Sequence, residues 1–309
     1  MIGDLPKKAA FKATRLTQTT FKIVEYNDIY SEHPFIYAKL FPALLLLLDT
    51  GCGGATNDPD VDLRQLRLFL ETHPVDENSG EPLNKAGTKK YVVVCSHCHF
   101  DHILGVEQFS SDSLILASSH SPSFLSSKNI GKHSLCERLG ILTPAYTPTL
   151  IDHLSYIAHV GVDTGMQVLH TPGHTPDELA LWDETERMLY VGDTLYEWSP
   201  IIFPPQGSIV DWFASVDMLI RLVKRVQSME PHGSLVKINS GHDTSMGDAL
   251  NVLTASRSFI NDVIGGKEKV KKKQEIQGVT IVYYERNDRR FSLRCPESLV
   301  EDARQKLHF

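Results

Sequence analysis

Long hydrophobic runs are missing from this chain of 309 residues. The most apolar stretch, ALLLLL at residues 43–48, is far shorter than the roughly 20 residues that a membrane-spanning helix needs. Residues 1–16 contain no apolar segment of the kind found in secretory signals. We therefore expect a cytoplasmic protein that does not associate with a membrane.

Cysteine is scarce, and its number is odd. The five cysteines, at positions 52, 95, 98, 136 and 295, make a poor disulfide framework, which agrees with a reducing compartment. Cys95 and Cys98 form a C-x-x-C pair, a spacing that redox proteins also use. Because Cys98 stands between two histidines and points to the opposite side of the chain, we expect it to pack in the core.

Positive charge is outnumbered by negative charge. The 31 Lys and Arg residues against 38 Asp and Glu give a formal net charge of -7, which disfavours binding to nucleic acid. We accordingly interpret the basic run KEKVKKK, at Lys267–Lys273, as a solvated loop. A chain of this length can bury a core without disulfides or a structural metal, so any metal site is available for catalysis.

Short segments rich in aromatic and β-branched residues, and the apolar run 43–48 that ends at a glycine-rich stretch, predict many strands. These segments are residues 21–26, 34–41, 43–48, 91–95, 114–117, 167–170, 178–182, 187–191 and 235–238. Helical spacing predicts helices at 61–72, 211–226 and 248–264, then a hairpin (279–284 and 291–294) and a last helix from Pro296. Strands, a helix and strands again indicate sheets covered by helices, an α/β layered sandwich.

The segment HCHFDH, at residues 97–102, carries the strongest chemical signal in the sequence. Imidazoles at positions i and i+2 point to the same side of an extended chain, so His97 and His99 can bind one ion together. Asp101 and His102, on the turn just beyond, offer a carboxylate and a third imidazole to a neighbouring ion. The sequence therefore predicts a metal site here.

Three later turns offer further ligands. His174 lies in TPGHT, Asp193 in YVGDT and His242 in NSGHD, and each follows a predicted strand on a turn that contains glycine. Such turns gather side chains at one edge of a sheet. His120 and His133 do not lie on turns of this kind, so we do not count them as ligands.

The order HxHxDH, TPGHT, GD and GH resembles the metallo-β-lactamase superfamily, over roughly residues 20–245. This resemblance implies an αββα four-layer sandwich with two metal ions at the edge of its sheets. It implies a first site of His97, His99 and His174, a second site of Asp101, His102 and His242, and Asp193 as a bridge. Asp49, after the leucine-rich strand, is similar to an aspartate that orients a ligand imidazole in this family, or else it is a simple turn carboxylate.

On this interpretation residues 1–309 are one domain of the metallo-β-lactamase type. Residues at about 118–160, expected as short helices and loops, would be an insert that covers the substrate. Residues at about 245–309 would be a C-terminal extension of helix and hairpin. Mixed histidine and carboxylate ligation suits two zinc ions, with iron or manganese as further options.

Two metal ions would supply a hydroxide nucleophile, and Asp101 would steer the water and pass a proton to the leaving group. The spacing Asp193-x-x-Tyr196 looks like that of the lactonase, acyl-thioesterase and glyoxalase-II-like branches. There the tyrosine hydroxyl donates to the developing oxyanion, although Tyr196 is equally compatible with a role as a pocket wall. Residues 197–212, with residues 118–160, would supply apolar surface for an acyl or aromatic group.

We therefore expect a dinuclear zinc hydrolase that opens a small ester-like bond, such as a lactone, a thioester or a lactam. The partner would be a small molecule, with no nucleic acid and no membrane. The alternative is an oxidoreductase of the persulfide-dioxygenase type with one iron ion, which does not use the second ligand set. Superfamily nucleases and non-catalytic relatives fit less well, because no basic arm is found and no ligand is missing.

Overall fold

The computed structural model describes residues 8–229 and 235–307. The chain divides into two compact units, Met1–Gly165 and Met166–Phe309. Among the described helices, none combines the length and the apolar character needed to cross a membrane.

The first unit is built on a seven-stranded sheet whose strands follow the order of the chain. The strands are β1 (Phe11–Arg15), β2 (Thr20–Glu25), β3 (Phe35–Leu40), β4 (Leu44–Leu48), β5 (Lys90–Val94), β6 (Leu114–Ser118) and β7 (Thr149–Ile151). Neighbours are antiparallel from β1 to β4 and parallel from β4 to β7. All five leucines of β4 are buried, as expected for a strand with no face in solvent.

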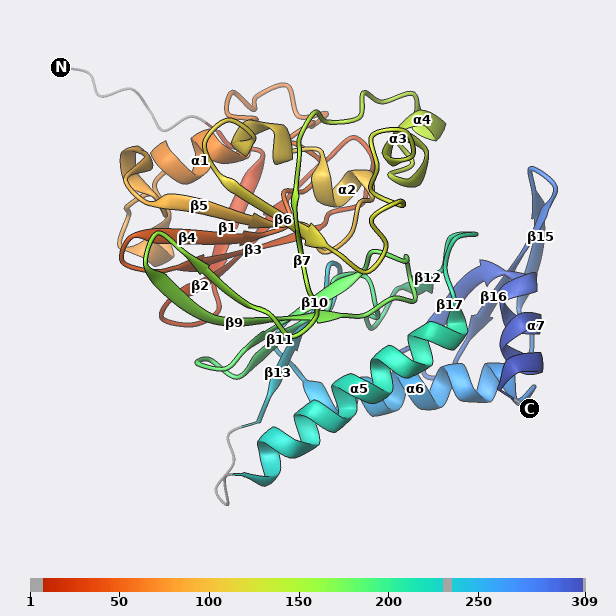
Figure 1. The fold of residues 1–309 in the computed structure, drawn as a ribbon. Helices are drawn as coiled ribbons and strands as arrows, with labels where there is room; N and C mark the ends of the chain where they lie inside the picture. Colours follow the sequence, from red (N-terminus) through yellow and green to blue (C-terminus); the bar gives the residue numbers. More distant parts are fainter. Residues whose placement is uncertain (1–7, 230–234, 308–309) are drawn as a thin grey trace. The chain divides into compact units, whose positions relative to one another are not determined.

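One face of this sheet packs against helices. Alternate strand residues such as Phe21, Ile23, Leu45 and Leu47 share a core with Phe69 of α1. The described helical segments of this unit are α1 (Leu66–Thr72), η1 (Asp76–Asn78), η2 (Lys85–Gly87), α2 (Phe100–Ile103), η3 (Val106–Phe109), α3 (Ile130–His133) and α4 (Cys136–Leu139). In Figure 1 helices α1 to α4 lie on the same side of the sheet.

Two further sheets follow. The six-stranded sheet has the order β14 (Gly247–Asp248), β13 (Lys237–Asn239), β11 (Met188–Tyr190), β10 (Leu179–Asp183), β9 (Val162–His170) and β8 (Tyr156–His159). The four-stranded sheet has the order β12 (Pro200–Ile202), β17 (Ser292–Pro296), β16 (Val279–Glu285) and β15 (Lys272–Ile276). The hairpin of β16 and β17 confirms the one predicted around Asn287-Asp288.

Three helices complete the second unit: α5 (Ile209–Ser228), α6 (Ala249–Ile264) and α7 (Glu297–Lys306). The side chains of Ser208 and Asp248 cap the first two by accepting from backbone N–H groups of the first turn. Helices α5 and α6 pack side by side and share a core with both sheets of this unit, centred on the fully buried Trp212 (Figure 1).

Some expectations about individual elements are wrong. The helix predicted at 61–72 begins only at Leu66, because Leu63 pairs as a β-bridge with Ala9. Strands β1, β7, β8, β12 and β14 were not predicted. Of these, β7 and β8 lie where short helices and loops were expected. Part of the basic run Lys267–Lys273 is the exposed start of β15 and not a loop, since Lys272 and Lys273 pair with β16.

A glycine-rich loop follows β4, and Gly54 is its most constrained residue. Gly54 has φ +82°, and a Cβ there would lie 1.7 Å from the carbonyl oxygen of Arg64. Gly80 has a similar φ of +75° but open space around it, so it is a matched control. We expect Gly80→Ala to lower the free energy of unfolding by about 1 kcal/mol, because of backbone strain alone. Gly54→Ala should cost about 1–3 kcal/mol more, measured by urea unfolding, and equal costs would contradict the close packing at Gly54.

Candidate metal centre

The segment predicted to bind metal follows β5 and is buried. His97 and His99 are 1% and 6% exposed, and Nε2 of His97 lies 3.0 Å from Nδ1 of His99. Asp101 and His102 lie in the short helix α2, with Oδ2 of Asp101 3.4 Å from Nε2 of His102. The first unit thus presents two pairs of potential ligand atoms on one short stretch of chain.

Asp49 holds this stretch in place. Its carboxylate accepts from the backbone N–H of Ser96 at 2.7 Å, from the Ser96 hydroxyl at 2.8 Å, and from Nδ1 of His102 at 2.9 Å. Asp49 therefore contacts the imidazole of a predicted ligand, as in the first of the two roles expected for it. Because Nδ1 of His102 donates to Asp49, its lone pair is on Nε2, the nitrogen that faces Asp101.

His174 is oriented in a comparable way in the second unit. It lies in the turn after β9, and its Nδ1 donates to the backbone carbonyl of Ile202 at 2.6 Å. This bond places the lone pair on Nε2. The turn is anchored to the start of α5, where the backbone N–H of Ser208 donates to the carbonyl of Gly173 at 2.7 Å.

Asp193 and His242 come from two turns that are joined to each other. The backbone N–H of Gly241 donates to the carbonyl of Gly192 at 2.7 Å. Oδ2 of Asp193 lies 3.5 Å from Nε2 of His242. The backbone N–H of Asp193 also donates to the fully buried carboxylate of Glu178 at 2.9 Å, which fixes the turn further.

Tyr196 follows on the same turn and is 4% exposed. Its ring packs edge-on against that of His242, with centroids 5.7 Å apart. The tyrosine is therefore next to a predicted ligand. This position is compatible with both of its expected roles, the oxyanion donor and the pocket wall.

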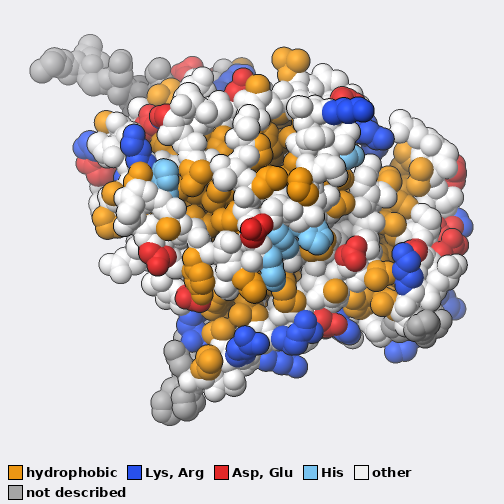
Figure 2. Space-filling view, in the orientation of Figure 1, with side chains coloured by type: hydrophobic (Ala, Val, Ile, Leu, Met, Phe, Trp, Pro, Cys, Tyr) orange, Lys and Arg blue, Asp and Glu red, His pale blue; other side chains and the backbone are white. Residues whose placement is uncertain are grey.

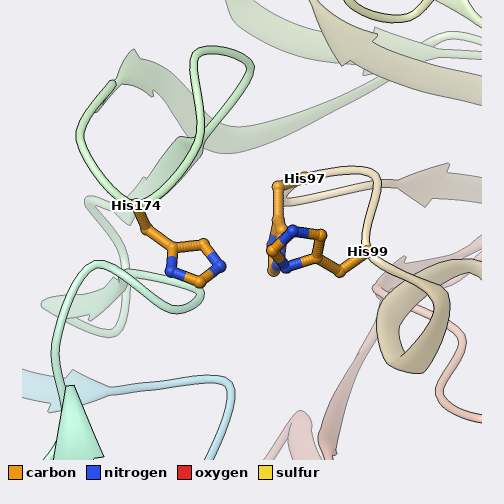
Figure 3. Close-up of side chains that lie close together, drawn as sticks. All are labelled: His97, His99 and His174. Carbon is orange, nitrogen blue, oxygen red and sulfur yellow. The ribbon is translucent and has the colours of Figure 1, made fainter. Parts of the chain in front are cut away.

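The structure contains two groups of potential ligands. Within each group, the potential ligand atoms all lie within 4.8 Å of one another. The groups are His97, His99 and His174, and Asp101, His102, Asp193 and His242. Figure 3 shows the three rings of the first group turned toward one another, and Figure 2 shows histidine side chains gathered on one face of the molecule. All seven residues predicted as ligands fall in these groups, and His120 and His133 fall in neither.

The spacing of these atoms fits divalent metal ions. A tetrahedral zinc ion with bonds of about 2.0–2.1 Å holds its ligand atoms about 3.3 Å apart. The three pairs described above are separated by 3.0, 3.4 and 3.5 Å. Imidazole nitrogens and carboxylate oxygens are also the donors that zinc, iron and manganese accept in proteins.

The burial of Cys98 confirms the packing role that was expected for it. Cys98 is fully buried against Ala117, Phe124 and Leu125, and all five cysteines are buried. His133 is equally structural, because its ring stacks on Phe124 at 3.9 Å and its Nδ1 contacts the carbonyl of Phe124.

Several buried acids were not predicted, among them Glu178 and Glu25. Glu178 is a charged residue directly before the apolar strand β10. This position was the only feature of the sequence that could have indicated its burial. Glu25 follows Phe21 and Ile23 at alternate positions of β2, so strand periodicity places it on the core-facing side. Burial raises the pKa of Glu25 to about 8, with a contribution from Asp28, against the lowering effect of N–H groups in the glycine-rich loop.

Comparisons with known proteins identify the family of this chain. The profile described as the metallo-beta-lactamase superfamily matches residues 85–232. The Aspergillus versicolor protein avaE, provisionally named a transcription factor, is 31% identical over 96% of this chain and 89% of its own. The human acyl-coenzyme A thioesterase MBLAC2 is 26% identical over 65% of this chain and 70% of its own.

Solved structures show the same fold. A metallo-beta-lactamase family protein from Thermus thermophilus aligns over 84% of this chain and 85% of its own, with a TM-score of 0.58 and 16% identity. A metallo-beta-lactamase from Pontibacter korlensis aligns over 82% of this chain and 99% of its own, with a TM-score of 0.53 and 16% identity. The predicted α/β fold class is confirmed.

Glu25 is expected to make stability depend on pH. Its pKa is raised on folding from 4.5 to about 8. The contribution of the protonated carboxyl group to the free energy of unfolding is therefore fully present below pH 4.5, and it is lost as the pH rises from 4.5 through 8. Glu25→Gln should therefore gain stability relative to the wild type between about pH 5.5 and 8.5, by up to about 4 kcal/mol in urea unfolding. The exposed Glu81→Gln is the control, and a pH-independent difference for Glu25→Gln would contradict the shift.

Proposed function

Since this chain belongs to the metallo-beta-lactamase superfamily, we propose that it is a dinuclear zinc hydrolase that opens a thioester or a related small ester-like bond. The observation that carries this proposal is the pair of ligand groups, seven side chains in all, which is more than one tetrahedral ion uses. The likeness to MBLAC2 favours a thioester over a lactone or lactam.

The ligand assignment follows the two groups. His97, His99 and His174 would hold one ion, and Asp101, His102 and His242 the other, with Asp193 between them. Two divalent cations bound in this way would activate a water molecule and polarise the carbonyl of the substrate. Asp49 positions His102 for this task, and Glu178 positions Asp193.

Asp101, besides being a ligand, and Tyr196 act on the reacting groups. The Asp101 carboxylate takes a proton from the attacking water and passes it to the leaving group, which for a thioester is the thiolate sulfur. The Tyr196 hydroxyl donates to the carbonyl oxygen as its negative charge grows. The water oxygen bonds to the carbonyl carbon as the C–S bond breaks, and the products are a thiol, a carboxylate and one proton released to solvent.

The other functions considered fit the described residues less well. A mononuclear iron oxidoreductase would not use the group of Asp101, His102, Asp193 and His242. A role like that in the name of avaE would require binding to DNA, which the formal net charge of -7 disfavours. The odd number of cysteines, five in all, supports a reducing compartment, and we propose the cytoplasm.

The purified protein should contain about two zinc ions per chain, because each ligand group suits one ion. Elemental analysis measures this, together with hydrolysis of acyl-coenzyme A, lactone and lactam substrates. We expect the highest kcat/KM on acyl-coenzyme A. One iron ion per chain with uptake of dioxygen would support the oxidoreductase instead.

Substitution of the proposed ligands tests which residues bind the metal ions. His97→Ala, His174→Ala and Asp193→Ala should each lower bound metal and abolish hydrolysis, whereas the exposed His120→Ala should change neither. Full activity and metal content in Asp193→Ala would overturn the dinuclear assignment.

Tyr196→Phe separates the oxyanion donor from the pocket wall. Phenylalanine keeps the ring against His242 but lacks the hydroxyl, so the variant loses one hydrogen bond that forms mainly in the transition state. We expect kcat to fall about 10²–10³-fold with KM and metal content nearly unchanged. An unchanged kcat would assign Tyr196 to the pocket wall.

A further inference from the structure

Trp198 is exposed in a way that folding alone does not favour. It is 66% exposed, whereas the two other tryptophans of the chain, Trp182 and Trp212, are 4% and 0% exposed. Its φ of +71° is in the left-handed region, which is strained for a bulky side chain. Strained residues persist only where the surrounding structure fixes them, and they cluster at ligand-binding sites.

The backbone around Trp198 is fixed by the turn between β16 and β17. The backbone N–H of Trp198 donates to the carbonyl of Arg290 at 2.8 Å. Nε of the same arginine donates to the carboxylate of Glu197 at 2.8 Å, and its Nη2 donates to Asn251 at 2.6 Å. Two contacts from Arg290 thus hold Glu197 and Trp198, so the exposed ring does not stand on a loose loop.

The same segment is tied to the candidate metal centre. The backbone N–H of Glu197 donates to the Thr244 hydroxyl at 2.8 Å, and the backbone N–H of Thr244 donates to the carbonyl of His242. Trp198 also comes two residues after Tyr196, whose ring packs against His242. The backbone that carries the exposed ring is therefore held close to the segments of His242 and Tyr196.

Ile202 provides a second exposed apolar side chain nearby in the sequence. It is 38% exposed at the end of β12, and its carbonyl accepts from Nδ1 of His174. Both exposed apolar residues therefore adjoin residues that hold or orient candidate ligands. Arg290 is already paired with Glu197 and Asn251, so this segment offers hydrocarbon surface and not a cation for a phosphate group.

We propose that Trp198 binds the acyl chain of a thioester substrate and thereby sets a preference for long chains. This proposal rests on the proposed function, and it assigns to Trp198 a role in binding and not in the chemical step. Contact with an acyl chain would cover the exposed indole, which explains why the fold holds a tryptophan in this conformation.

Fluorescence tests the contact without turnover. The probe is a non-hydrolysable thioether of coenzyme A whose hexadecyl chain carries bromine, which quenches a tryptophan that it touches. Because Trp182 and Trp212 are buried, we expect saturable quenching in the metal-loaded wild type, loss of that quenching in Trp198→Phe, and none with coenzyme A alone. Equal quenching in the wild type and in Trp198→Phe, or quenching by coenzyme A alone, would overturn the proposal.

Kinetics tests the chain-length preference. Trp198→Ala should raise KM for a hexadecanoyl thioester about tenfold, and leave kcat and the KM for an acetyl thioester nearly unchanged. The matched control is Met229→Ala, a 73% exposed apolar residue at the far end of α5. Equal losses on both chain lengths would mean a structural role and would overturn the proposal.

The two proposals can fail separately. A wild type with no activity on any thioester would overturn the proposed function, and the quenching experiment would still decide whether Trp198 contacts an acyl chain. An active wild type without quenching would overturn the role of Trp198 alone.

Discussion

The carboxylate of Asp49 is the constraint on which the candidate metal centre depends. It accepts three hydrogen bonds, two from Ser96 and one from His102, and so fixes the segment that carries four of the predicted ligands. Asp49 itself is in the left-handed region, at φ +64°, directly after the buried strand β4. The rigid sheet therefore sets the direction of the imidazole of His102, which satisfies the general requirement that metal ligands be oriented before the ion binds.

In the second unit, backbone hydrogen bonds and a buried acid hold the candidate ligands in place. The turns of Asp193 and His242 are joined by the bond between Gly241 and Gly192, and Glu178 holds the first turn through the N–H of Asp193. Arg290 then ties the chain beyond Tyr196 to the C-terminal hairpin. The candidate ligands of this unit and the exposed Trp198 thus lie on segments that hydrogen bonds tie to the sheets and to the hairpin.

Local sequence patterns predicted many of the candidate ligands and several of the strands and helices. The i, i+2 spacing of His97 and His99 and the glycine-bearing turns of His174, Asp193 and His242 are short-range features, and their residues fall in the two ligand groups. The strand and helix patterns of β4, α5 and α6 were readable for the same reason, because the period of apolar residues is set by backbone geometry. The start of α1 was misplaced because Leu63, although apolar and helically spaced, pairs with Ala9.

The sequence by itself determined the chemistry of the ligands and their order along the chain, since residue types and short spacings are written in it directly. Only the tertiary structure decided which acids are buried and what they hold. Glu25 lies under the glycine-rich loop, Glu178 binds the N–H of Asp193, and Arg290 reaches Glu197 from 93 residues away. The physical reason is that a hydrogen bond depends on distance in space, and no periodicity along the chain records which distant segments the sheets bring together.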